Sequence, residues 1–184
     1  VKAALAKWPN VPHCYGWLAL DARGQWFMRD DRVQARGPFP KVKGSRIDHE
    51  KLLAFIHRNY EADAQGCWYF QNGPQRVYVE LEAAPWVWRL SRDSTAANNS
   101  NPSALIITSH TGRTTTTAAT YLDAQGHLFV DTPIGIGLVH TQDMHLAADE
   151  VQRGEWTPQA VDFATMPARF GFVRGPALLR GAKG

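Results

Sequence analysis

The feature that most constrains the fold is a short sequence that occurs twice. Residues 20–30 read Leu-Asp-Ala-Arg-Gly-Gln-Trp-Phe-Met-Arg-Asp, and residues 122–131 read Leu-Asp-Ala-Gln-Gly-His-Leu-Phe-Val-Asp. In each copy an Asp/Gly turn separates two apolar runs, which is typical of a β-hairpin. Each copy precedes a helix-like segment and a Gly-x-Trp sequence, at 66–68 and at 154–156. The repetition predicts two related hairpin-helix units, with a binding site where the halves meet.

The composition is typical of a folded globular chain. Its 184 residues are 44% hydrophobic and include seven tryptophans, which is enough to build a core without a covalent staple. The formal net charge is only +3. Two widely separated cysteines, Cys14 and Cys67, predict free thiols in a reducing compartment. Without a long apolar run or a secretory signal, we expect a cytoplasmic protein with no membrane partner.

Periodicity predicts both helices and strands. Apolar residues at helical spacing indicate a helix over about 48–61, capped by Ser45 or Asp48, and a second helix over about 142–152. Alternating and β-branched runs indicate strands between the helices. We therefore expect an α+β fold with mostly antiparallel sheets in one compact body. Its parts are a first unit at 13–90, a polar linker at 91–103, a second unit at 104–175 and a loose basic tail at 176–184.

Several motifs resemble a known bacterial family. Trp26-Phe27 is followed by a helix, then by Gly66-x-Trp68-Tyr69 and by an acidic strand that ends in Ala-Pro-Trp-Val at residue 87. This order resembles that of the family called domain of unknown function 1285, and residues 114–130 with Val139-His140-x-x-Asp143 resemble its second half. The resemblance implies an α+β fold with two repeated motifs. It implies no established reaction, although ligand sensing or signalling is the role usually suggested.

His140, Asp143 and His145 form the densest cluster of candidate ligands or proton carriers. Two histidines five residues apart on one helix point about 140° apart, so they are poorly placed to share a metal ion. We therefore predict neither a metal nor a cofactor. His140 with Asp143 is a candidate ligand-binding pair, and a structural hydrogen bond is the simpler alternative.

The tryptophans suggest a second candidate site. Trp86 and Trp88 share one face of a predicted strand, and Arg76 and Arg89 lie close to them in the predicted sheet. Exposed rings next to arginines would make a stacking surface for a planar or anionic ligand. Packing in the core is the alternative for both rings.

Glu80 and Glu82 are two residues apart on one predicted strand. Paired carboxylates can perform glycosidase chemistry. However, alternation with Val79 and Leu81 predicts that both glutamates lie on a solvent-exposed face. We therefore predict no catalytic residues at this position.

Residues 32–46 carry five positive charges and no negative charge, together with several prolines and glycines. This pattern predicts an exposed irregular loop. Such a loop is a candidate basic patch for phosphate or nucleic acid, although an ordinary solvated loop is the simpler interpretation and nucleic acid is not the favoured partner. The patch consists of Arg32, Arg36, Lys41, Lys43 and Arg46.

Together these patterns favour a non-enzymatic module that binds a small molecule or a protein partner, with a regulatory role. Two alternatives remain open. One is an enzyme that uses His140 and Asp143 as acid and base between the two halves. The other is nucleic-acid or phosphate binding through residues 32–46.

Overall fold

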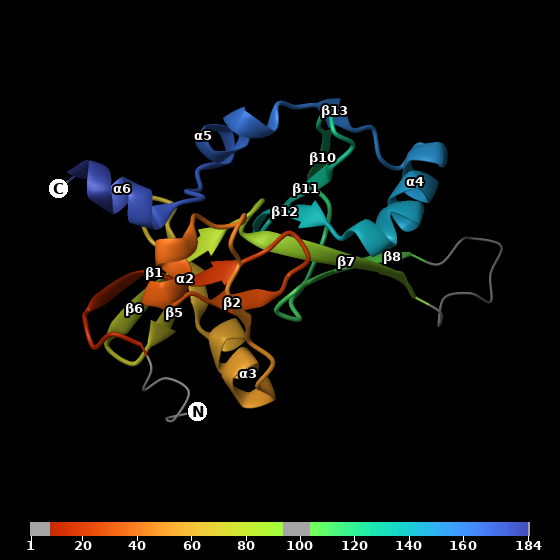
Figure 1. Ribbon diagram of the computed structural model, residues 1–184. Coiled ribbons are helices and arrows are strands. Elements are labelled where there is room, and N and C mark those ends of the chain that lie inside the picture. Colours follow the sequence, from red (N-terminus) through yellow and green to blue (C-terminus); the bar gives the residue numbers. More distant parts are fainter. Residues whose placement is uncertain (1–7, 94–103, 184) are drawn as a thin grey trace. The chain divides into compact units, whose positions relative to one another are not determined.

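The computed structural model describes residues 8–93 and 104–183 (Figure 1). It divides into two compact units. Unit 1 contains the described residues up to Ala83 together with those from Gly171 on, and unit 2 is Ala84–Phe170. The predicted division at 91–103 is displaced, because strand β7 (Trp86–Arg92) pairs with β8 (Leu105–Ser109) and so belongs to unit 2. Residues 94–103 of the predicted linker lie outside the described residues.

Unit 1 is built on a mixed sheet. Among its described residues the sheet has six strands in the order β3-β2-β1-β6-β5-β4. The central pair, β1 and β6, is parallel, and every other pair is antiparallel. The strands are β1 (His13–Leu20), β2 (Trp26–Met28), β3 (Ser45–Arg46), β4 (Tyr60–Ala62), β5 (Trp68–Asn72) and β6 (Gln75–Leu81). The helices are α2 (Asp31–Arg36), α3 (Glu50–Arg58) and α6 (Pro176–Lys183).

Unit 2 has a sheet of the same kind. Its described residues form seven strands in the order β13-β10-β11-β12-β7-β8-β9, with parallel pairs at β12–β7 and at β10–β13. Besides β7 and β8, the strands are β9 (Thr114–Thr115), β10 (Ala119–Leu122), β11 (Leu128–Thr132), β12 (Gly135–Val139) and β13 (Gln159–Ala160). The helices are α4 (Met144–Gln152), α5 (Met166–Phe170) and two 3-10 turns, Thr141–Asp143 and Phe163–Thr165.

The two sheets share a strand order. Six strands of unit 2, read as β9-β8-β7-β12-β11-β10, follow the same sequence of connections as the sheet of unit 1, with a parallel pair at the centre. The predicted α+β fold with mostly antiparallel sheets and two similar halves is confirmed. However, this order makes the hairpin at 122–131 (β10–β11) the counterpart of β4–β5, and not of the hairpin at 20–30 that it resembles in sequence.

One five-residue turn occurs four times in the described residues. The side-chain oxygen of its first residue accepts the N–H groups of the third and fifth residues. The N–H of the first residue donates to the carbonyl of the fifth, and the fourth is a glycine with φ between 80° and 93°. Glycine is required there because other residues rarely adopt positive φ. The four turns are Asp21–Gln25, Asp63–Cys67, Ser109–Arg113 and Asp123–His127.

Each sheet carries a buried apolar layer. The largest fully buried side chains include Trp26, Phe70 and Ile56 in unit 1 and Trp88 and Phe129 in unit 2. Burial of such side chains stabilises each by about 1.5 to 3 kcal/mol. Helix α3 contributes Leu52 and Ile56 to the core of unit 1, as its periodicity predicts.

Both predicted helices are present, with one correction to a cap. Helix α3 begins after His49, whose Nδ1 accepts the N–H of Leu52 at 3.2 Å. His49 therefore takes the capping position that we predicted for Ser45 or Asp48. A neutral imidazole nitrogen can accept this bond as a carboxylate does.

The end of the chain differs from the prediction. Residues 176–183 form helix α6 instead of a loose tail, because Leu179 packs against the buried cluster of Cys67, Tyr69 and Tyr78. Phe170 is the last residue of helix α5. Both cysteines are free, as predicted, and both are buried. Within residues 8–93 and 104–183, no helix is long and apolar enough to cross a membrane.

The turn glycines provide a test of the fold. Gly66 has φ +85°, and a Cβ there would overlap the carbonyl oxygen of Gly171, whereas Gly73 has φ +56° and open space around it. We expect Gly73→Ala to lower the free energy of unfolding by about 1 kcal/mol, the cost of the left-handed conformation. Gly66→Ala should cost at least about 2 kcal/mol more, because backbone must also move. Urea denaturation measures both, and equal costs would contradict the close approach.

Candidate functional site

A cavity of about 830 Å³ opens in unit 1. Its wall combines residues of four strands with helix α6 and the turn at Asp63–Cys67. Most pockets that bind small molecules have volumes of about 300 to 1,000 Å³, so this cavity is of suitable size. It is lined by Tyr15, Ala62, Asp63, Ala64, Gln65, Cys67, Tyr69, Arg76, Tyr78, Pro176, Leu179 and Arg180.

Three tyrosines and two arginines form a continuous row in this wall, which we call the tyrosine row. Tyr15 and Tyr78 are stacked, with ring centroids 4.5 Å apart and an interplanar angle of 3°. The ring of Tyr69 lies 5.7 Å from that of Tyr78. The Arg76 guanidinium lies 4.4 Å from the centroid of Tyr69, and that of Arg180 lies 4.8 Å from the centroid of Tyr15. Each end of the row therefore carries a positive charge held over a ring face.

Strand register explains how the row forms. Tyr69 on β5 and Tyr78 on β6 are direct cross-strand partners, and such neighbours have adjacent side chains. Tyr15 comes from β1, which runs parallel to β6 on its other side. The pairing of β1 with β6 is irregular between Cys14 and Leu18, where Gly16 has φ +83°. A bulge of this kind redirects side chains, and here Tyr15 lies flat on Tyr78.

Hydrogen bonds orient two of the three phenols of the row. The Tyr69 hydroxyl donates to Glu61 at 2.8 Å, and the Tyr78 hydroxyl points to Asp63 at 3.5 Å. Burial and the bond to Glu61 raise the pKa of Tyr69. Burial and the neighbouring Tyr78 raise the pKa of Tyr15. The cavity therefore offers neutral ring faces flanked by guanidinium groups, a combination suited to a planar anion.

Of the residues predicted for a stacking surface, only Arg76 lies in this cavity. Trp86 and Trp88 are 1% and 0% exposed, so neither presents a free ring face and the prediction of a stacking surface there needs correction. Their indole N–H groups donate to the carbonyls of Ile134 at 2.9 Å and Val130 at 3.0 Å. The two rings stack on each other in the core of unit 2, with their centroids 6.0 Å apart.

The Gly-x-Gly sequence at 135–137 accommodates these indoles. A Cβ at Gly135 would lie 3.0 Å from the Trp86 nitrogen, and one at Gly137 would overlap the Trp88 ring. Glycine at both positions therefore lets β12 pass close to the two rings.

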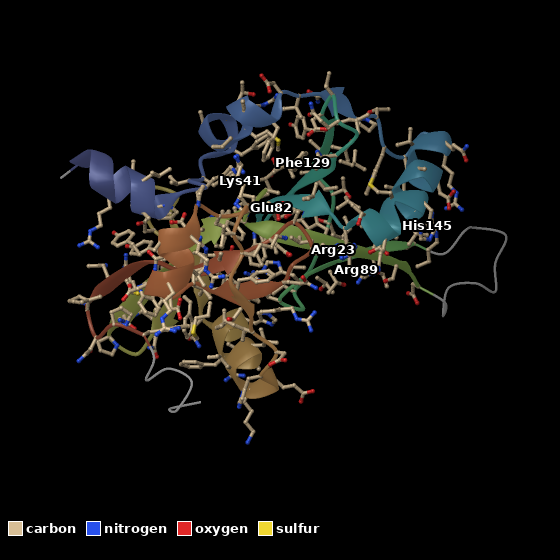
Figure 2. All side chains as sticks on the ribbon, viewed as in Figure 1. Arg23, Lys41, Glu82, Arg89, Phe129 and His145 are labelled. Carbon is tan, nitrogen blue, oxygen red and sulfur yellow. The ribbon has the colours of Figure 1, made fainter. Side chains whose placement is uncertain are left out.

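His140 and Asp143 hold the start of α4 against β7. The Nδ1 atom of His140 accepts the N–H of Gln142 at 3.1 Å, and the backbone N–H of His140 donates to the Trp88 carbonyl at 2.9 Å. The Asp143 carboxylate accepts from Arg89 Nε at 2.7 Å and from the N–H of Leu90 at 2.9 Å. Figure 2 labels Arg89 on β7, where its side chain is 51% exposed. These contacts match the structural alternative given above.

The basic segment at 32–46 is irregular only in part: it begins in α2 and ends in β3, and residues 37–44 between them form no helix or strand. Residues up to Arg36 belong to α2, where the Asp30 carboxylate caps the helix by accepting the N–H of Val33 at 3.0 Å. The buried Arg29 guanidinium donates to the carbonyls of Gly37 at 2.7 Å and Val42 at 3.3 Å. These two bonds hold the backbone of the segment around the buried Arg29 side chain.

The predicted basic patch is only partly exposed. Lys43 is paired with Asp21 at 3.0 Å and with Glu82 at 3.4 Å, so its charge is already balanced within unit 1. Lys41, a member of the patch, and Glu82, a partner of Lys43, are labelled in Figure 2. The remaining members of the patch are exposed: Arg32, Arg36, Lys41 and Arg46.

Neither Glu80 of β6 nor Glu82, which follows this strand, lies on an open solvent face, and this corrects the prediction from alternation. Glu80 is half-buried, and its Oε1 accepts the N–H of Ala177 at 3.3 Å. Burial raises the pKa of Glu80 to about 7, against the opposing effects of this bond and of Arg29. Glu82 accepts the N–H of Ala22 at 3.0 Å.

The tyrosine row was only partly visible in the sequence. Alternation in β6 places Arg76, Tyr78 and Glu80 on the more polar side of the strand, which was a usable signal for two members of the row. Arg180 was missed because the segment was assigned to a loose tail. Within the described ranges, no three His, Cys, Asp or Glu side chains are arranged to hold a metal ion.

Comparison with known proteins identifies the family. Residues 1–177 match the family DUF2944, described as "Protein of unknown function (DUF2946)". The chain belongs to this family. Membership of DUF2944 brings no reaction or ligand with it, so a function has to be argued from the site. Among curated proteins, no match to the chain is found.

Two solved structures are similar to this DUF2944 member. One is a DUF1285 family protein from Shewanella baltica OS155, with 13% identity, a TM-score of 0.48, and coverage of 73% of this chain and 91% of that chain. The other is a DUF1285 family protein from Silicibacter pomeroyi DSS-3, with 12% identity, a TM-score of 0.49, and coverage of 79% and 74%. Both carry the name of the family that the motifs at 26–87 resemble.

The Arg89–Asp143 pair can be tested through stability. Burial alone would raise the pKa of Asp143, but the bonds from Arg89 and Leu90 outweigh it and lower the pKa. The stabilisation is therefore present above the ordinary carboxyl pKa of about 4 and is lost as the pH falls further. We expect Asp143→Asn to lower the free energy of unfolding by about 2 kcal/mol at pH 7.

Urea denaturation at pH 7 and pH 3 measures this effect. Asp149→Asn, the same change on α4 outside the Arg89 pair, is the control and should behave like the wild type. A cost for Asp143→Asn that is as large at pH 3 as at pH 7 would show that the charge of the carboxylate is irrelevant.

Proposed function

We propose that the chain is a small-molecule-binding module. Its site is the cavity of unit 1 that the tyrosine row lines, which we call the tyrosine cavity, and its ligand is a planar organic anion. The observation that carries this proposal is the tyrosine row, in which two guanidinium groups flank three aromatic rings. Rings supply apolar contact area at a low cost in side-chain entropy. The guanidinium groups supply charge and paired donors that match a carboxylate, sulfonate or phosphate.

The site is largely preformed. The tyrosines are fixed by strand register and by their hydroxyl bonds to Glu61 and Asp63, so little side-chain freedom is lost on binding. Of the row's two charged ends, Arg180 is exposed and Arg76 is half-buried. These properties favour recognition over catalysis.

Acid-base catalysis by His140 and Asp143 is supported less well. The Nδ1 atom of His140 already accepts a backbone N–H, and both oxygens of Asp143 lie within 3.3 Å of Arg89. A general base must be able to reach a substrate proton, and these bonds leave the pair engaged in holding α4.

The ligand class can be tested with four small probes. We expect 2-naphthoate to bind, because it is planar and anionic. The neutral amide 2-naphthamide lacks the charge, cyclohexanecarboxylate lacks the planar ring, and 2-naphthylmethylamine has the opposite charge. Isothermal titration calorimetry should give the tightest binding for 2-naphthoate, and equal affinities for all four would contradict the proposal. Native mass spectrometry of the purified protein tests independently for a retained small molecule.

Substitution of the arginines tests the location of the site. Arg76→Gln and Arg180→Gln should each weaken 2-naphthoate binding about fivefold, which corresponds to about 1 kcal/mol for one cation–ring and charge contact. Arg23→Gln is the matched control, since Arg23 is exposed in unit 1 and does not line the cavity. Binding that Arg23→Gln weakens as much as the other two would indicate a general charge effect and not this site.

A further inference from the structure

The repeated five-residue turn allows three aspartates to be compared within one chain. Three of the four turns begin with Asp, and in each of them the Oδ1 atom accepts both backbone N–H groups of the turn. The turn does not use the second carboxylate oxygen, Oδ2, which is left to bind another group. Its partner differs between the turns that begin at Asp21, Asp63 and Asp123.

In two of these turns, Oδ2 has a close partner in the same unit. Oδ2 of Asp21 accepts from the Lys43 ammonium group at 3.0 Å. Oδ2 of Asp123 lies 2.8 Å from the Nδ1 atom of His127. Both aspartate side chains are only 1% exposed. A carboxylate oxygen that is buried on folding loses its water, and these partners replace the lost hydrogen bonds.

The turn at Asp63 differs, and it lines the tyrosine cavity. Within residues 8–93 and 104–183, Oδ2 of Asp63 has one hydrogen bond, from the Tyr78 hydroxyl at 3.5 Å. Most O–H···O bonds are 2.7 to 2.8 Å long, so this contact is weak. The Asp63 side chain is half-buried, and Tyr78 lines the same cavity. This oxygen therefore keeps an acceptor capacity that the other two turns use internally.

The turn restricts the direction of this oxygen. Oδ1 of the same carboxylate accepts the N–H groups of Gln65 and Cys67, each at 2.9 Å, and a carboxylate is planar. The turn is itself held in place, since the N–H of Val173 donates to the carbonyl of Gly66 at 3.0 Å. The Oδ2 atom is therefore a preorganised acceptor, which loses little side-chain freedom when a ligand binds.

We propose that the ligand of the tyrosine cavity carries a neutral hydrogen-bond donor, an aromatic hydroxyl or amine N–H, which Oδ2 of Asp63 accepts. The ligand class is then the hydroxy- or amino-substituted aromatic anions. This inference rests on the proposed function, because it adds a substituent to the ligand of the same site. The arginines of the tyrosine row bind the anionic group, and Asp63 selects the substituent.

The charges in the cavity wall favour a neutral donor. Arg76 and Arg180 line the same cavity as Asp63. An ammonium group on the ligand would be attracted by one carboxylate but repelled by two guanidinium groups. A hydroxyl or aromatic amine forms a charge-assisted bond to the carboxylate without that repulsion. An ether offers no donor, and its lone pairs would face those of Oδ2.

Matched pairs of naphthoates test the donor in the wild-type protein. The 5-, 6- and 7-hydroxy derivatives of 2-naphthoate place a donor at different positions of the ring, and each methoxy derivative keeps the oxygen without the donor. In isothermal titration calorimetry, the best-placed hydroxy compound should bind about tenfold more tightly than its methoxy match and than 2-naphthoate. Equal affinities within every pair would overturn the inference without the need for a variant.

Two substitutions test whether Asp63 is the acceptor. Ser109 begins the fourth turn, and its hydroxyl accepts the N–H groups of Thr111 and Arg113 at 3.2 and 3.1 Å, so Asp63→Ser can keep the turn without the second oxygen. Asp63→Asn keeps the shape of the side chain but puts an NH₂ group in place of Oδ2. Both variants should bind the hydroxy and methoxy compounds equally well. A preference that persists in both would show that it comes from the size of the methyl group.

Asp123→Asn is the matched control. It makes the same change at the same position of the turn, but in unit 2 and away from the cavity. It should therefore keep the preference of the wild type for the hydroxy compound. Loss of the preference in Asp123→Asn as well would contradict the assignment to Asp63.

The outcomes separate this inference from the proposed function. Binding of 2-naphthoate with no preference for any hydroxy compound would overturn the donor and leave the tyrosine cavity as a site for planar anions. Failure of every naphthoate to bind, hydroxylated or not, would overturn the proposed function itself. A hydroxyl preference that disappears in both Asp63 variants would support the two proposals together.

Discussion

The structure depends on one interaction, an oxygen atom that accepts two backbone N–H groups across a five-residue turn. It closes four hairpins, at Asp21, Asp63, Ser109 and Asp123, and so sets the register of the strands on either side. Register in turn decides which side chains share a face. The Asp63 turn sets β4 against β5, and the pairing of β5 with β6 beyond it makes Tyr69 and Tyr78 direct partners.

Local patterns in the sequence predicted the elements that local interactions control. The Asp/Gly turns, the apolar stripe of α3 and the second helix all depend on residues close in sequence. The division into units was misplaced because it depends on pairing between distant strands, β7 with β12, which leaves no mark in a local pattern. The identical Asp-Ala-Gln-Gly at 63–66 and 123–126 does identify the corresponding hairpins, but the longer similarity of 20–30 to 122–131 obscured it.

The candidate site was also predicted only in part, because it too depends on contacts between residues that are distant in sequence. Arg76 was predicted to lie beside aromatic rings, and it does, although the rings are tyrosines of its own sheet and not the tryptophans of β7. The large rings of Trp86 and Trp88 suggested a binding surface. In the structure, however, the indole N–H of each donates to a backbone carbonyl in the core of unit 2. Burial of that kind depends on the passage of β12 along the rings. The position of Arg180 over Tyr15 likewise requires a helix that only tertiary packing stabilises.

Unit 1 is discontinuous in sequence, since its last helix follows the whole of unit 2. During synthesis the ribosome therefore makes β1 to β6 first, with the wall formed by α6 still missing, and adds the closing helix about 90 residues later. Unit 2 can fold in that interval, whereas the tyrosine cavity acquires its second arginine only after synthesis has passed residue 180. The wall of the tyrosine cavity is thus completed only after unit 2 has been made, and a chain truncated after unit 2 would keep the strands of both sheets but have an open cavity with one of its two arginines.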